Sequence, residues 1–90
     1  MSAERVLKII NEKGLHARAS AKFVEVVEKF DAEAEVEKDG MSVSGDSIMG
    51  LLMLAASRGT EIVVRTEGAQ AEALMDALAD LVGDKFGEGF

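Results

Sequence analysis

The chain contains no cysteine and no proline, and it has a single histidine, His16. Without cysteine there is no disulfide framework, no thiolate chemistry and no cysteine-based metal site. A single histidine cannot build a histidine-rich metal centre, so we expect neither a metal nor a cofactor. Tryptophan and tyrosine are also absent, and the four aromatic residues are all phenylalanine. The core must therefore be built mainly from aliphatic side chains.

Positive charge is scarce as well: ten Lys and Arg stand against 17 Asp and Glu, which leaves a net charge of −7. Nucleic acids are bound by clustered Lys and Arg, so no nucleic acid partner is expected. The same shortage argues against an acidic membrane surface, and no apolar run is long enough to span a bilayer. The 90 residues suffice for one domain, 1–90. We expect a single cytoplasmic domain.

Hydrophobic periodicity predicts alternating strands and helices along the chain. Strands are expected at 6–10, 32–37, 41–43 and 61–66. Helices are expected from His16 to Asp31, at 48–54, and from Ala71 to Phe86. Asp39-Gly40 predicts a two-residue type I′ hairpin turn, so the sheet is at least partly antiparallel. The βαββαβα order predicts an α+β open-faced sandwich, and the tail from Gly87 is expected to be loose.

The sequence Gly14-Leu15-His16-Ala17-Arg18 lies at the junction between the first expected strand and the first expected helix. Backbone N–H groups at a helix start have no intrahelical partner, and the helix dipole adds partial positive charge, so anions such as phosphate bind there. The same field favours a neutral imidazole, which can attack phosphorus. Arg18 would offer a fork of donors to phosphate oxygens. A surface histidine beside a solvated arginine would show the same pattern, so that alternative stays open here.

Ser47 precedes the second expected helix and is its expected N-cap, a position where a phosphate would suit the helix dipole. The following run, 48–54, is apolar on more than one face, and so short a helix cannot bury all of it. We expect an exposed, partner-binding patch among its side chains, namely Ile48, Met49, Leu52 and Met53. A fully buried helix is the alternative.

Residues 14–18 resemble the active-site signature of HPr, the histidine-containing phosphocarrier family of the bacterial phosphoenolpyruvate-dependent phosphotransferase system. Residues 45–51, Gly-Asp-Ser-Ile-Met-Gly-Leu, resemble that family's regulatory serine segment, and the spacing, the hairpin and the length agree. The resemblance covers essentially the whole chain. It implies an antiparallel four-stranded sheet with three helices on one face. The stretches 19–23 and 48–56 are similar to the alphaproteobacterial branch of the family, where the role is often regulatory.

The resemblance implies a phosphoryl carrier rather than an enzyme. His16 would accept the phosphoryl group from enzyme I and pass it to an EIIA-type domain, with Arg18 assisting. Ser47 would be the target of an HPr kinase/phosphorylase. The docking surface of a monomer making transient complexes would comprise Ala21, Ile48, Met49 and Leu52. Ala19 stands where the family usually has proline, which implies a less rigid first helical turn.

Two other functions are compatible with the sequence. The chain could be mainly a regulatory module of nitrogen or carbon metabolism that binds partners through Ser47 and the apolar run, without sugar transport. It could also be a generic α+β ligand-binding domain. That third hypothesis needs convergent polar groups in a pocket between sheet and helices, and nothing in the sequence supplies them.

Overall fold

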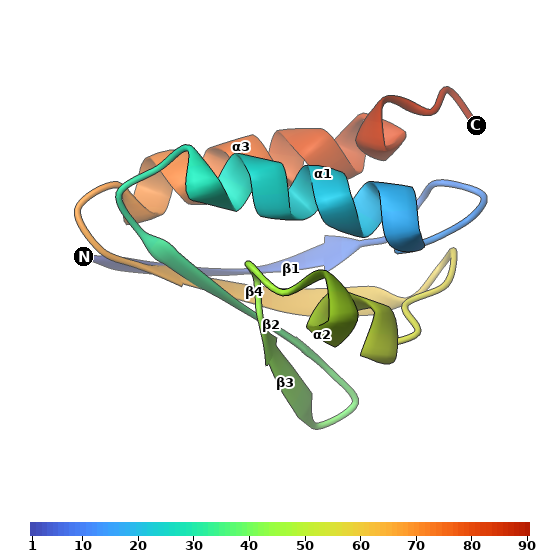
Figure 1. Ribbon diagram of the computed structural model, residues 1–90, viewed down its shortest axis with the longest axis horizontal. Helices are drawn as coiled ribbons and strands as arrows, with labels where there is room; N and C mark the ends of the chain where they lie inside the picture. The colour runs from blue at the N-terminus through green and yellow to red at the C-terminus, as the bar shows by residue number, and fades with distance from the viewer.

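The computed structural model describes residues 1–90 and places three helices on one side of a four-stranded sheet (Figure 1). The strands are β1 (Ser2–Lys8), β2 (Glu33–Lys38), β3 (Met41–Ser44) and β4 (Glu61–Glu67). The helices are α1 (Ala17–Glu28), α2 (Ile48–Met53) and α3 (Ala71–Gly83), followed by a 3₁₀ turn, Lys85–Gly87. The predicted βαββαβα open-faced sandwich is confirmed.

The strand order in the sheet is β1-β4-β2-β3, and every neighbouring pair is antiparallel. The last strand in sequence therefore lies in the middle. The predicted turn between β2 and β3 is confirmed, because Asp39 and Gly40 both have positive φ, 51° and 84°. Along β2, Ala34 and Val36 are buried under the helices while Glu33 and Glu35 are exposed on the open face.

The core is aliphatic around two fully buried phenylalanines, Phe23 and Phe86. Buried residues recur on α1 at helical spacing: Ala19, Ser20, Phe23, Val24 and Val27. On α3 the buried positions are Ala71, Leu74, Met75, Leu78 and Val82. Both helices lie side by side across the same face of the sheet (Figure 1). This packing holds the start of α1 at one end of the sandwich.

Several predicted boundaries are wrong. β1 runs from Ser2, paired with Glu67, to Lys8, whereas a strand was expected at 6–10. Ser2 and Glu4 lie on the open face of the sheet, and Arg5, on the helix side, pairs with Asp76 of α3, so no apolar run marks this half of the strand. The first helix ends at Glu28 rather than Asp31. The third ends at Gly83, because Lys85 and Phe86 both have a φ of 55° and turn the chain away.

Candidate functional site

The structure places His16 at the N-cap of α1, with φ −80° and ψ −175°. Its carbonyl oxygen accepts a hydrogen bond from the N–H of Ser20 at 2.8 Å, which closes the first turn. The N–H groups of residues 17–19 find no acceptor within the chain and stay available for an external anion. Ala19, in the place of the usual proline, is fully buried and its helix is regular from Ala17 onward.

The loop before His16 is fixed by Gly14 and Leu15. Gly14 has a φ of +65°, which favours glycine, and a Cβ there would lie 2.5 Å from the carbonyl oxygen of Ala56. The N–H of Leu15 donates to that same carbonyl oxygen at 2.9 Å. The loop is thereby attached to the segment that follows α2, and His16 has a defined position.

The C-terminal tail folds back over His16, so the expectation that it is loose is wrong. Oε2 of Glu88 contacts Nε2 of His16, and the Glu88 side chain is only 5% exposed. The backbone N–H of Glu12 donates to the carbonyl oxygen of Phe90 at 3.1 Å. Figure 1 shows the tail, in red, at the same end of the molecule as the loop between β1 and α1. These contacts join residues more than 70 positions apart, so no local pattern indicated them.

His16 lines a hollow of about 420 Å³ together with three cationic side chains, Lys13, Arg18 and Lys22. The His16 side chain is 28% exposed, which leaves its ring accessible. Arg18 is exposed, and no carboxylate of the chain is paired with it. A protein with a net charge of −7 thus gathers positive charge around its only histidine. The arrangement suits a small anion.

An anion from the chain itself already contacts this site. Burial alone raises the pKa of Glu88, but hydrogen bonds from Asn11 and His16, aided by the charges of His16 and Lys13, outweigh it and lower the pKa below the ordinary value of 4.5. Glu88 is therefore a carboxylate at neutral pH. A carboxylate oxygen can only accept, so the contact requires a proton on Nε2 of His16; when the ring is neutral, the lone pair is then on Nδ1.

Ser47 is the N-cap of α2, as predicted, and its hydroxyl accepts a hydrogen bond from the N–H of Gly50 at 3.0 Å. The exposed fractions are 40% for Ile48, 69% for Met49 and 64% for Met53. Leu52 and Ala21 are half-buried. The predicted exposed patch is confirmed, and the alternative of a fully buried helix is wrong. We refer to Ile48, Met49, Leu52 and Met53 as the α2 patch.

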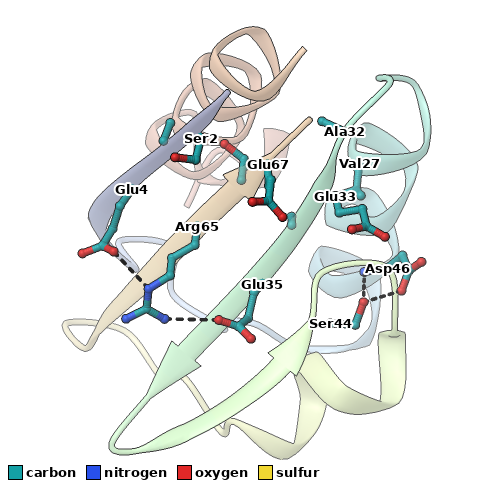
Figure 2. A pocket seen from close by; sticks show the side chains of 13 residues that line it. Ser2, Glu4, Val27, Ala32, Glu33, Glu35, Ser44, Asp46, Arg65 and Glu67 are labelled. Carbon is teal, nitrogen blue, oxygen red and sulfur yellow. Dashed lines mark hydrogen bonds and ion pairs between the residues drawn. The ribbon is translucent and has the colours of Figure 1, made fainter. Parts of the chain in front are cut away.

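A larger hollow, of about 670 Å³, lies over the open face of the sheet away from His16 (Figure 2). Arg65 lines this hollow and pairs with Glu4 at 3.0 Å and Glu35 at 3.3 Å, which also line it, and with Glu37 at 2.8 Å. The hydrogen bonds that Arg65 donates to Glu37 and Glu4 raise the pKa of its guanidinium. Arg65 is the only cation that lines this hollow and it is paired with glutamates, whereas Glu33 and Glu67 line it without an ion pair, so the hollow is acidic and does not suit an anion.

No three His, Asp or Glu side chains are grouped so that they could hold a metal ion. The hypothesis of a ligand pocket between sheet and helices would have gained support from a buried His16 with Arg18 turned away from it. The structure places both side chains around one open hollow instead. Separately, no helix has the length and hydropathy needed to cross a membrane.

A family model described as "PTS HPr component phosphorylation site" matches residues 3–84. The chain is 51% identical over 83 residues to the phosphocarrier protein HPr of Neisseria meningitidis serogroup A, covering 92% of this chain and 93% of that protein. The crystal structure of HPr from Thermoanaerobacter tengcongensis superposes with a TM-score of 0.93 at 41% identity, over 98% of this chain and 99% of that one. The catabolite repression protein Crh of Bacillus subtilis, described as a swapped dimer, has a TM-score of 0.75 and 35% identity, over 88% and 91% of the two chains.

Proposed function

The chain belongs to the HPr family of phosphotransferase-system phosphocarriers, and we propose that it carries the phosphoryl group on His16. As a member of this family it is a carrier that interacts with phosphotransferase-system enzymes, and not a catalyst in its own right. In the proposed relay, phospho-enzyme I donates to His16 and an EIIA-type domain receives the group from it. The protein acts as a monomer in these transient complexes.

The observation that carries the proposal is the anion-binding arrangement around the only histidine. With its proton on Nε2, facing Glu88, the neutral ring of His16 has the lone pair on Nδ1 for attack on phosphorus. The unpaired N–H groups at the start of α1 can donate hydrogen bonds to the phosphoryl oxygens. Arg18 has no competing carboxylate and would neutralise the charge of the transferring group. Nucleophile, donors and cation thus belong to one end of one helix.

The α2 patch and Ala21 supply the proposed docking surface, because α2 packs against α1, which begins at His16. Ser47 is the proposed regulatory phosphorylation site at the edge of that patch. A phosphoserine carries about −1.5 to −2 charges at neutral pH. At the N-cap this charge suits the dipole of α2, but it must be desolvated when a partner covers the patch. Phosphorylation of Ser47 would therefore weaken docking while leaving the fold intact.

A second candidate is a mainly regulatory module, in which Ser47 and the α2 patch bind a partner and phosphotransfer is secondary. The similarity to Crh, a catabolite repression protein, favours it, and so does the exposed patch. The presence of His16 with a free Arg18 favours the carrier role. The two are separated by comparing His16→Ala with Ser47→Asp in cells. The regulatory candidate requires that only Ser47→Asp change the phenotype.

Phosphorylation by purified enzyme I and phosphoenolpyruvate tests the carrier proposal. The wild-type chain should take up one acid-labile, base-stable phosphate, and His16→Ala should take up none. Arg18→Ala should still be phosphorylated, at a rate lower by on the order of 100-fold, because it removes charge stabilisation from the transition state. Uptake of the same phosphate by His16→Ala would show that His16 is not the acceptor.

A further inference from the structure

We propose that Glu88, aimed by Asn11, is a positioning residue for His16: its carboxylate holds the proton on Nε2 and presents Nδ1 to the incoming phosphoryl group. This inference rests on the proposed carrier function. It assigns a role to the C-terminal tail, which sequence patterns indicated to be loose. It also gives a buried polar residue, Asn11, a part in the chemistry.

Asn11 is fully buried, and both N–H groups of its side-chain amide donate hydrogen bonds. Nδ2 donates to the carbonyl oxygen of Gly14 at 2.8 Å and to Oε1 of Glu88 at 3.0 Å. If the amide were flipped, Oδ1 would face the carbonyl oxygen of Gly14 and the carboxylate of Glu88, and neither can donate a hydrogen bond to it. The hydrogen-bond network therefore fixes the orientation of the Asn11 amide. Oδ1 is left buried without a partner. An unpaired buried acceptor lowers the stability of a fold. Asn11 therefore orients Glu88 at a cost in folding free energy.

The backbone of the tail is held on both sides of Glu88. Nζ of Lys22 donates to the carbonyl oxygen of Phe86 at 2.7 Å, just before it. Just after it, Phe90 accepts from the N–H of Glu12 at 3.1 Å. Nζ of Lys13 lies 5.7 Å from the centre of the Phe90 ring, within the range of a cation–π interaction. Glu88 is thus brought to His16 by backbone anchors as well as by its own side chain.

A carboxylate on one ring nitrogen assists chemistry at the other. It orients the imidazole, selects the Nε2–H tautomer, and stabilises the positive charge that the ring gains when Nδ1 forms a bond. In the transfer, the Nδ1 lone pair forms the new N–P bond while the bond between phosphorus and the donor breaks, and its electron pair stays on the donor atom. The Nε2 proton remains on His16, where Glu88 balances the charge of the phosphorylated ring.

Glu88 contacts the edge of the ring away from Nδ1, which argues against the tail as an obstruction. A blocking tail would lie between Nδ1 and the partner, and its removal would speed up transfer. The two roles predict opposite signs for the effect of Glu88→Ala on the rate. The rate measurement below therefore decides between them.

The tautomer is measured directly because His16 is the only histidine, so its ring ¹⁵N signals are unambiguous. At a pH where the ring is neutral, we expect the wild-type chain to show predominantly the Nε2–H form. Glu88→Ala should lose that preference, and Glu88→Gln, which can still accept a hydrogen bond, should lose less of it. The matched control is Glu72→Ala, an exposed residue on α3, which should retain the wild-type spectrum. These spectra require no enzyme I.

The rate supplies the second readout. Glu88→Ala should lower the maximal rate of phosphorylation by enzyme I by about 10- to 100-fold, as loss of a histidine-orienting partner does elsewhere, with little change in KM. Circular dichroism and urea unfolding confirm that each variant is folded. A wild-type tautomer and rate in Glu88→Ala, or a faster rate, would overturn the role of Glu88 and leave the carrier function intact. Absence of phosphate on the wild-type chain would instead overturn the carrier function.

Discussion

Gly14 sets the position of His16 from two residues away, and it tolerates a side chain poorly. Its φ of +65° favours glycine, and a Cβ would approach the carbonyl oxygen of Ala56 to 2.5 Å. We expect Gly14→Ala to lower the free energy of unfolding by roughly 2–4 kcal/mol, since the backbone strain and the clash add. Urea unfolding of the variant and the wild type measures this loss of stability. Phosphorylation of His16 should slow as well, because the loop must move.

Gly40→Ala is the matched control at the residue scale. Gly40 also has a positive φ, +84°, but nothing lies within 4 Å of a Cβ there. Only the backbone strain applies, so we expect a loss of roughly 1 kcal/mol and an unchanged phosphorylation rate. If both variants lost equal stability, the contact between Gly14 and Ala56 would not be what excludes a side chain from position 14.

At the scale of elements, α2 depends on its N-cap. Ser47→Ala removes the acceptor for the N–H of Gly50 and should cost about 1 kcal/mol in the free energy of unfolding. Ser47→Asp keeps a capping oxygen, so we expect near wild-type stability. It adds charge beside the α2 patch, however, and should weaken binding to enzyme I. Thermal unfolding measures the stability of each variant, and titration calorimetry measures its affinity for enzyme I.

The control for added charge is Ala69→Asp, an exposed position just before α3. It introduces the same charge near the start of a different helix, at the end of the molecule away from the start of α1 (Figure 1). Binding of enzyme I should be unaffected. If Ala69→Asp weakened binding as much as Ser47→Asp does, net charge rather than the α2 patch would govern docking.

At the scale of the whole molecule, the contact between the tail and His16 makes stability depend on pH. The folded-state pKa of Glu88 lies below its ordinary value of 4.5, so the carboxylate stabilises the fold above that value. This contribution is lost as the pH falls through the folded-state pKa. Wild type should therefore exceed Glu88→Gln in the free energy of unfolding at pH 7 by on the order of 1–3 kcal/mol, and the difference should shrink at pH 3.

Urea unfolding at the two pH values measures this difference, and Glu72→Gln is the control. Glu72 is exposed in the first turn of α3 and makes no ion pair, so its substitution should not reproduce the pH dependence. A difference between wild type and Glu88→Gln that stayed constant down to pH 3 would mean that the charge of Glu88 contributes nothing to the fold.

Local patterns predicted the parts of the fold that depend on neighbouring residues. The alternation of 32–37 became β2, Asp39-Gly40 became the turn, and Ser47 became the N-cap of α2. Each of these is decided within a few residues by φ preferences, hydrogen bonding or period. The polar half of β1 and the end of α3 were predicted wrongly. The extent of β1 is set by its partner β4, which is about 60 residues away in sequence.

By itself, the amino-acid sequence determined the element order, the absence of cysteine, and the placement of His16 at a helix start beside Arg18. These follow from residue types and short spacings. Only the tertiary structure decided what surrounds His16. Asn11 and Glu88 meet across 77 positions because the sheet and α3 bring the two ends of the chain together. Such a contact has no local signal, since its energy arises only after the core has packed.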